Sequence, residues 1–179
     1  AYDHGPVLYK QVRLTKDGKR YSILKFRSMR VDAEKDGVAR LASDHDDRIT
    51  PVGRLIRAIR FDELPQLINI LKGDMSIVGP RPERPEIAAQ YEKEMPAFSL
   101  RLQVKAGLTG IAQVYGRYNT EPRDKLKMDL MYINRMSLAE DLKLIFATIK
   151  ILLMKESTQG IGNGQITAEK TEKVVEKSA

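Results

Sequence analysis

The sequence predicts a single α+β domain, and three observations indicate this class. Two β-prone runs, residues 7–13 and 21–27, are joined by a segment that contains Asp17-Gly18, a strong hairpin signal. Several later segments repeat apolar residues at the helical spacing. With 179 residues, of which 42% are hydrophobic, the chain can bury one core but is short for two domains. We expect residues 1–156 to form this domain.

Composition narrows the classes of partner and chemistry. The chain has no cysteine, which excludes disulfides and thiolate metal sites. Its 31 Lys and Arg residues against 24 Asp and Glu give a net charge of +7, which favours anionic partners such as nucleotide phosphates, phospholipid head groups or nucleic acid. No signal peptide opens the chain, and no apolar run of about 18 residues predicts a membrane span.

The segment between the hairpin and the first helix is polar and contains Asp44-His45-Asp46-Asp47. Its spacing matches no calcium-binding loop, so we predict a solvated loop here. Thr50-Pro51 then supplies an N-cap and a first-turn proline, which predicts the start of a helix. This helix carries apolar residues on one face and arginines in other directions: Val52, Leu55, Ile56 and Ile59 against Arg54, Arg57 and Arg60.

Asp62 and Glu63 stand where the next helical pattern begins. Asp62 is predicted to be its N-cap, Pro65 lies in its first turn, and Lys72-Gly73 ends it. Two interpretations of the acidic pair stay open. Acidic residues are ordinary helix starters worth about 1 kcal/mol. A helix N-terminus is also a natural place for a phosphate oxygen.

Prolines and glycines divide the middle of the chain. Residues 74–82 predict a short strand that runs into the turn Gly79-Pro80-Arg81-Pro82, which would hold the Arg81 side chain in a fixed direction. Residues 83–103 predict two helical pieces split by Pro96. Residues 105–117 form a glycine-punctuated, β-prone stretch whose backbone can approach a ligand closely.

The C-terminal part predicts two helices and a tail. One helix covers residues 121–135, and the next opens with the capping box Ser137 to Glu140 and continues as the most hydrophobic element. This second helix either packs in the core or lies in a membrane interface, and both alternatives stay open. Residues 157–179 lack periodicity and predict a mobile tail.

Three motifs closely resemble the bacterial sugar transferase family, the monotopic polyprenyl-phosphate phosphoglycosyl transferases. They are Lys25-Phe-Arg27-Ser-Met29, the run from Asp62 to Pro82, and the run from Gly107 to Arg117, and the resemblance extends from about residue 5 to about residue 155. It implies transfer of a sugar 1-phosphate from a UDP-sugar to a membrane polyprenyl phosphate, with release of UMP. Such reactions begin the synthesis of capsule, exopolysaccharide or other surface glycans. A catalytically silent UDP-sugar-binding or assembly domain is the alternative.

The resemblance also assigns roles to residues. Asp62 would be the nucleophile that forms a phosphosugar intermediate, and Glu63 would help to hold Mg²⁺. A carboxylate is ionised at neutral pH and needs no general base, and Mg²⁺ usually takes one or two protein carboxylates. The arginines implied in binding substrate phosphates are Arg57, Arg81 and Arg117.

Four further residues carry open alternatives. Lys25 and Arg27 share one face of a strand, where they either line the site or are solvated. Asp129 and Asp141 match acidic positions in the C-terminal helices of the family and are either ligands or members of salt bridges. Tyr115 stands where many relatives carry Asn, which leaves the donor sugar undetermined.

The resemblance finally implies a location. Family members carry a hydrophobic membrane segment just before residue 5, so we expect this chain to be an excised catalytic domain that lacks its anchor. Its native place would be the cytoplasmic face of a bacterial cell membrane, with the helices from Pro51 and Ser137 lying on lipid. Nucleic acid is not expected as a partner, since aromatic residues make up 6% of the chain and no recognised reader motif occurs. Whether the chain forms a homo-oligomer stays open.

Overall fold

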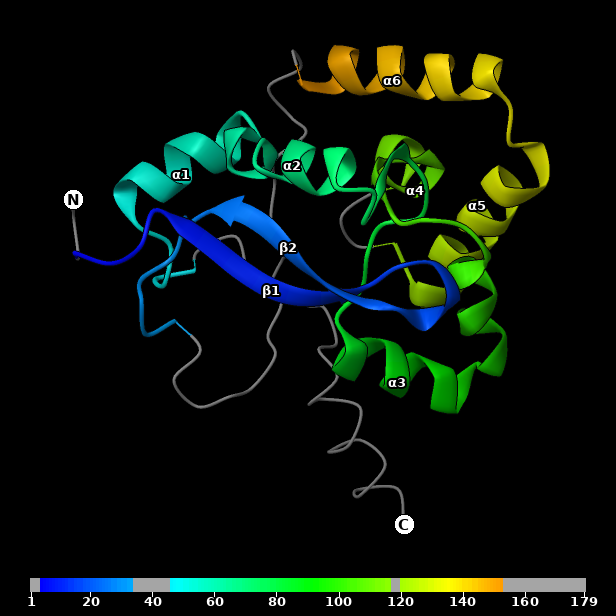
Figure 1. The fold of residues 1–179 in the computed structure, drawn as a ribbon, viewed down its shortest axis with the longest axis horizontal. Coiled ribbons are helices and arrows are strands. Elements are labelled where there is room, and N and C mark those ends of the chain that lie inside the picture. The colour runs from blue at the N-terminus through cyan, green and yellow to red at the C-terminus, as the bar shows by residue number, and fades with distance from the viewer. Residues whose placement is uncertain (1–3, 34–45, 117–119, 153–179) are drawn as a thin grey trace.

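The computed structural model describes residues 4–33, 46–116 and 120–152. Its first unit is the predicted hairpin, in which β1 (Leu8–Leu14) pairs antiparallel with β2 (Arg20–Phe26) (Figure 1). The connecting turn η1 (Lys16–Gly18) holds Asp17 and Gly18 at φ values of 58° and 69°. Positive φ at both positions is what an Asp-Gly turn supplies, so the hairpin and its turn chemistry are confirmed.

A second, parallel pair of short strands lies deeper in the molecule. β3 (Ser76–Val78) pairs with β4 (Gly107–Thr109), and the connection between them carries α3 (Pro85–Glu94) and the 3₁₀ helix η3 (Pro96–Gln103). The predicted division at Pro96 is confirmed. A Cβ atom on Gly107 would overlap the backbone of Gly79, so the two strands approach this closely only because both positions are glycine.

Two successive helices follow the polar segment along one side of the hairpin. α1 (Pro51–Ala58) begins as predicted, with the Thr50 hydroxyl accepting a hydrogen bond from the Gly53 amide at 2.9 Å. α2 (Gln66–Leu71) follows after a 3₁₀ turn, η2 (Phe61–Glu63). The side chain of Asn69 joins α2 to β2, because it accepts from the Leu24 amide at 2.9 Å and donates to the Ser22 carbonyl at 2.9 Å.

The C-terminal half is helical. α4 (Ile111–Tyr115) is a helix where a β-prone stretch was predicted, because Ile111 packs into a core cluster with Val78 and Leu144 and this packing overrides the local β preference. α5 (Pro122–Arg135) and α6 (Leu138–Leu152) confirm the two predicted helices, and the Ser137 hydroxyl accepts from the Glu140 amide at 3.2 Å.

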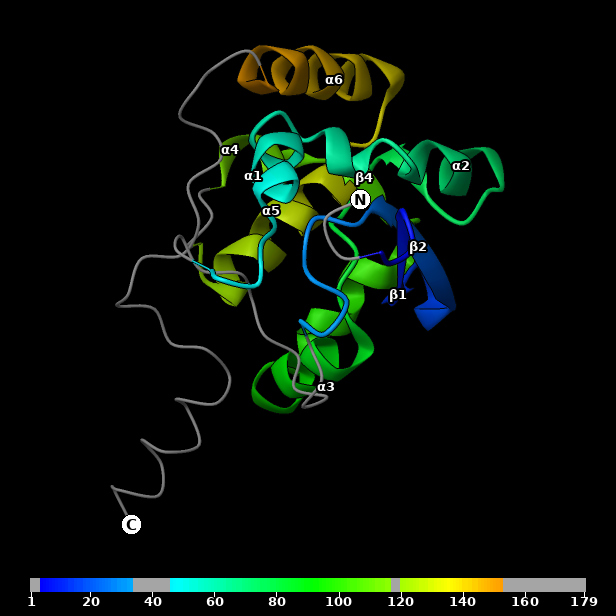
Figure 2. The same cartoon turned by 90° about the vertical axis from the view of Figure 1, so that its left-hand side faces the viewer.

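Much of the apolar surface of α1, α2 and α6 faces outward. Figures 1 and 2 place α6 on the same side of the molecule as α1 and α2. In α6 only Leu144 is buried, so the core alternative for this helix is wrong for most of its apolar residues. We call one set of exposed apolar side chains the apolar face; they come from the segment that runs from α1 through η2 to α2, and from α6. They are Val52, Leu55, Ile59, Phe61, Leu64, Leu67, Ile68, Leu71, Leu138, Leu142, Phe146, Ile149 and Leu152. No helix among the described residues is long and apolar enough to cross a membrane.

Two predictions about flexible segments have different outcomes. Asp46 is buried, and its carboxylate receives the Arg48 guanidinium at 2.6 Å and 2.8 Å, so the prediction of a solvated loop is wrong at Asp46. The carboxylate also accepts from the Arg48 backbone amide, which fixes it locally. Asp44, His45, Arg117 and the tail at 157–179 lie outside the described residues.

Candidate active site

The acidic pair lies on the 3₁₀ turn η2, between α1 and α2. Arg60, immediately before the turn, has the left-handed backbone angles φ 52° and ψ 23°. This reversal makes Arg60 the N-cap of η2, while Pro65 is the N-cap of α2, and neither helix start has a side-chain capping hydrogen bond. The prediction that Asp62 is an N-cap is therefore wrong, and its carboxylate is not used as a cap.

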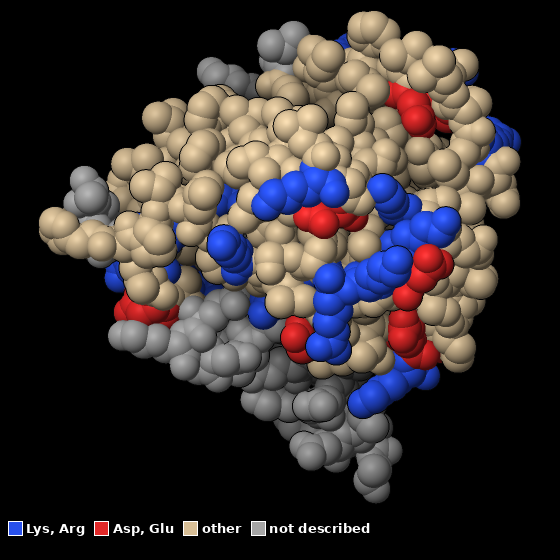
Figure 3. Space-filling model, in the orientation of Figure 1, with Lys and Arg blue, Asp and Glu red and all other residues tan. Residues whose placement is uncertain are grey.

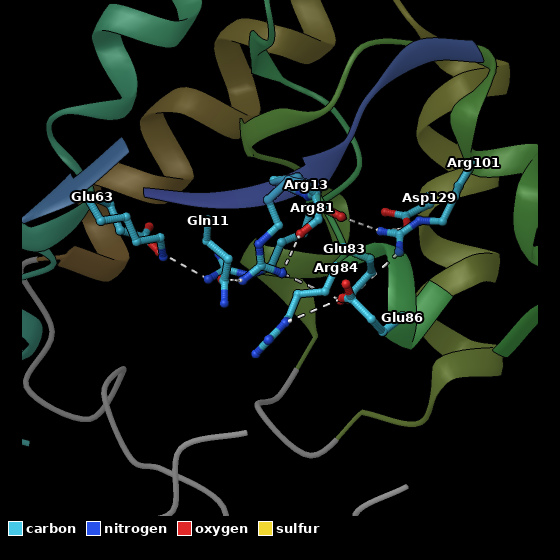
Figure 4. A network of polar contacts seen from close by, with 11 residues as sticks. Gln11, Arg13, Glu63, Arg81, Glu83, Arg84, Glu86, Arg101 and Asp129 are labelled. Atoms are coloured by element: carbon cyan, nitrogen blue, oxygen red, sulfur yellow. Dashed lines mark hydrogen bonds and ion pairs between the residues drawn. The ribbon is translucent and has the colours of Figure 1, made fainter. Parts of the chain in front are cut away.

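Glu63 joins three segments of the chain. Its Oε1 atom accepts from Lys25 Nζ at 3.1 Å and from Arg81 Nη2 at 3.0 Å (Figure 4 shows the contact with Arg81). Burial alone would raise the pKa of Glu63, but the charges of Lys25, Arg81 and Arg60 outweigh burial and hold that pKa well below its usual range. Glu63 is thus ionised at neutral pH and shared between two cations.

Asp62 is a buried carboxylate in a mixed electrostatic environment. It is 9% exposed, and this burial raises its pKa. The charge of Lys25 opposes that rise, Glu63 adds to it, and Arg57 opposes it. Burial also lowers the pKa of Lys25, although Glu63 acts in the opposite direction. The structure therefore brings Asp62, Glu63, Lys25, Arg57 and Arg81 together.

Arg81 approaches this group from the turn that follows β3. Its side chain is 45% exposed while its Nη2 contacts Glu63, so the guanidinium sits at the rim of the site. On the same side, Arg13 of β1 donates to the Pro82 carbonyl at 3.2 Å and to Gln11 Oε1 at 2.6 Å. Figure 3 shows Lys and Arg side chains gathered in a band over this part of the molecule, below a mostly uncharged upper part.

The remaining predicted residues lie elsewhere. Arg27 Nε donates to the Pro6 carbonyl at 2.7 Å, next to the start of the described chain. Asp129 is 1% exposed and forms an ion pair with Arg101, with 2.7 Å between Oδ2 and Nη2. Asp141 Oδ1 accepts from the Tyr132 hydroxyl at 2.8 Å near the start of α6. Neither Asp129 nor Asp141 forms one of its described contacts with Glu63.

The sequence analysis missed two residues that hold the site together. Asn69 fixes α2, which follows the acidic pair, to β2, which carries Lys25. Arg101 is 3% exposed and supports the Arg81 turn. The signal for both is the same, a polar residue inside an otherwise apolar helical run, as in Leu67-Ile-Asn69-Ile or Leu100-Arg101-Leu.

The acidic pair is the place where a metal ion would fit. Within residues 4–33, 46–116 and 120–152 no cluster of three or more His, Cys, Asp or Glu side chains is arranged to hold a metal. Mg²⁺ does not need such a cluster, because it commonly takes one or two carboxylates and completes its octahedron with water and substrate oxygens. Glu63 is the residue here that could hold a Mg²⁺ ion together with phosphate oxygens of a substrate.

Comparison with known proteins identifies the family to which the chain belongs. A sequence model of the bacterial sugar transferase family matches residues 1–155. The UDP-N-acetylgalactosamine-undecaprenyl-phosphate N-acetylgalactosaminephosphotransferase of Aeromonas hydrophila is 43% identical over 152 residues, which cover 83% of this chain and 36% of that protein. The UDP-glucose:undecaprenyl-phosphate glucose-1-phosphate transferase of Caulobacter vibrioides is 42% identical over 86% of this chain and 59% of its own length.

A third relative is closer in length. The uncharacterized sugar transferase EpsL of Bacillus subtilis is 39% identical over 92% of this chain and 78% of its own length. The chain thus spans about a third to three fifths of the first two relatives and most of the third. The match to the family covers every described residue of the site, and the chain belongs to the bacterial sugar transferase family.

Proposed function

We propose that this chain transfers a sugar 1-phosphate from a UDP-sugar to a polyprenyl phosphate and releases UMP. The observation that supports this most directly is the buried Asp62 carboxylate, which sits beside an ionised Glu63 that pairs with Lys25 and Arg81. The names of two relatives specify a UDP-sugar and undecaprenyl phosphate, which supports the same class of donor and acceptor here. Because one relative uses N-acetylgalactosamine and another glucose, family membership does not select the hexose.

The proposed reaction has two displacements at one phosphorus atom. In the first, a carboxylate oxygen of Asp62 attacks the phosphorus that carries the sugar, and the bond from that phosphorus to UMP breaks. In the second, a phosphate oxygen of the acceptor attacks the same phosphorus, and the bond to Asp62 breaks. The products are the polyprenyl diphosphate sugar and the restored carboxylate. The acceptor phosphate is ionised at neutral pH, and the charges of Lys25 and Arg57 favour the ionised form of Asp62 against its burial, so neither step is given a general base.

The neighbouring side chains stabilise the charge of the transferred phosphoryl group. Arg81 lies at the rim with a planar fork suited to phosphate oxygens, and Arg57 acts on Asp62 from α1. Arg117 is proposed as a third phosphate ligand from the resemblance alone. Lys25 keeps Glu63 ionised and adds positive charge beside the nucleophile. A Mg²⁺ ion held by Glu63, together with the diphosphate, would reduce the repulsion between the attacking carboxylate and the phosphate.

The apolar face supports a membrane surface as the place of reaction. It is formed by α1, η2, α2 and α6, it is rich in Leu, Ile and Phe, and it continues from the turn that carries Asp62. Soluble monomers rarely expose apolar patches of this extent without a partner. We propose that this face lies on the cytoplasmic leaflet of the cell membrane, where the Asp62 turn can meet a polyprenyl phosphate.

Intact-mass measurement tests the proposed reaction. The wild-type chain, Asp62→Asn and the surface control Asp124→Asn are incubated with Mg²⁺ and a panel of UDP-sugars, while UMP release is followed. Asp124 is a suitable control because its side chain is 50% exposed and pairs with Lys127 at the start of α5. We expect a phosphosugar adduct on wild type and Asp124→Asn and none on Asp62→Asn. An adduct of equal yield on Asp62→Asn would contradict the nucleophile. Donor binding without UMP release would favour the catalytically silent alternative.

A further inference from the structure

We propose that Arg101, held in place by Asp129, is a positioning residue that sets the Arg81 side chain by fixing the backbone beneath it. This inference rests on the proposed function only in giving Arg81 a phosphate to bind. Arg101 comes from η3 and Asp129 from α5, so two elements outside the acidic turn would control one of its cations. Figure 4 shows the Arg101 side chain pointing toward the Arg81 segment, with Asp129 beside its guanidinium group.

The contacts of the Arg101 guanidinium support this role. Arg101 Nη2 donates to the Arg81 carbonyl at 2.7 Å and lies 2.7 Å from Asp129 Oδ2. Arg101 is 3% exposed and Asp129 is 1% exposed, so this pair is closed to solvent. Arg101 also lies over the Phe98 ring, 4.8 Å from its centroid, and its Nη1 is 3.9 Å from Glu83 Oε1.

Arg101 completes an unbroken row of held carbonyl groups. The Pro80 carbonyl accepts from the Gly107 amide at 2.9 Å, and the Pro82 carbonyl accepts from Arg13 Nη1 at 3.2 Å. The Glu83 carbonyl accepts from the Leu14 amide at 3.0 Å. With the Arg81 carbonyl held by Arg101, four consecutive carbonyls are anchored, and the two prolines fix φ on both sides of Arg81. Such a segment holds its side chain in one direction.

The depth of the pair explains why Arg101 acts through Arg81 and not on substrate. A residue that is 3% exposed and lies against the buried Phe98 ring does not reach a diphosphate at the rim of the site. A buried guanidinium is tolerated when a carboxylate compensates its charge, and Asp129 does so. Burial raises the pKa of Asp129 to about 6, with Arg101 acting to lower it, so the pair is charged at neutral pH. Lysine lacks the planar fork that meets a carbonyl and a carboxylate together.

A double-mutant cycle with Arg81 tests the inference. Removing Arg101 alone would leave a buried, unpaired carboxylate, so the test variant is Arg101→Met with Asp129→Leu, which replaces the pair by apolar side chains. We expect this pair variant to lower UMP release by about 10- to 100-fold, the scale of a small misplacement of a substrate-binding group. In an Arg81→Ala background the same two substitutions should lower UMP release by about twofold or less, because the guanidinium that Arg101 positions is absent. Equal losses in both backgrounds would overturn the inference.

Two further arms separate positioning from loss of stability and from failure of the proposed function. Leu126→Ala perturbs the same core without contacting Arg81, so its effect on UMP release should be the same with and without Arg81. Exchange of the Leu14 amide, which is bonded to the Glu83 carbonyl, reports on the segment without any turnover. The pair variant should speed this exchange and leave that of the Thr15 amide, bonded to Lys19, unchanged. If no UDP-sugar is turned over, the hydrogen-exchange experiment alone tests the inference. An unchanged exchange rate of the Leu14 amide in the pair variant would then reject it.

Discussion

Leu55 of α1 and Phe146 of α6 are 66% and 67% exposed, and replacing either by Asp should weaken binding to lipid vesicles. Burying a whole Leu or Phe side chain in an apolar medium is favourable by about 1.5–3 kcal/mol. Two thirds of that gain is about 1–2 kcal/mol for each position, and an inserted carboxylate adds a cost of its own. Since 1.4 kcal/mol corresponds to a factor of ten, each variant should bind about tenfold more weakly or worse. The double variant should lose about a hundredfold, because the two positions lie on separate helices.

Flotation with vesicles that contain anionic lipid measures this binding. The matched control is Leu100→Asp, which places the same charge on a residue that is 44% exposed in η3, an element packed on α3 and α5. We expect the control to float like wild type at both low and high salt. If Leu55→Asp and Phe146→Asp float as well as the control does, the apolar face does not bind lipid. If all three variants fail equally, charge alone and not the position of the face controls binding.

Three further predictions concern the site and its support. Lys25→Met removes a charge-assisted hydrogen bond worth about 1.5–3 kcal/mol, so the pKa values of Glu63 and Asp62 should rise. In a plot of the rate of UMP release against pH, the fall in rate on the acidic side should then occur about 1–2 pH units higher than in wild type. An unchanged pH profile would contradict the role of Lys25. Gly53→Ala should lower the free energy of unfolding by about 1–3 kcal/mol, measured with denaturant, because a Cβ atom there would overlap the Ser28 carbonyl. A free energy of unfolding equal to that of wild type would show that α1 can shift. The pKa of Asp129 is about 6 in the folded chain, against the ordinary value of 3.8 that we take for the unfolded chain. The protonated carboxyl therefore contributes stability that is fully present below pH 3.8 and is lost as the pH rises through 6. Asp129→Asn should flatten this part of the curve of unfolding free energy against pH, and an unchanged curve would contradict the raised pKa.

Local patterns were enough to predict most elements. The hairpin follows from Asp17-Gly18, α1 from Thr50-Pro51, and α6 from the capping box at Ser137. In each case the chemistry that starts the element lies within a few residues of it. Periodicity also identified the apolar residues of α1 and α6, but it cannot tell whether an apolar face meets a core or lies outside it.

The errors arise where distant contacts decide. Asp62 looks like an N-cap in sequence, yet the left-handed backbone at Arg60 starts the turn earlier and places the carboxylate inside it. Ile111 belongs to a helix because its side chain packs against residues more than 30 positions away in either direction. Arg101 was missed for a similar reason, since its partners Arg81 and Asp129 come from other segments. The resemblance supplied Asp62, Glu63 and Arg81, and the structure supplies the residues that hold them.

The pairing of β3 with β4 has a consequence for the order of folding. Only two residue pairs, Ser76 with Gly107 and Val78 with Thr109, are in register across these strands, and a long helical connection separates them. So short a ladder gains too little to offset the entropy of closing that loop until the core around Tyr132 and Leu144 has formed. The hairpin, whose strands are neighbours in sequence, has no such delay. We therefore expect the turn that carries Arg81 to be among the last parts to become ordered as the chain folds, after the strand that carries Lys25.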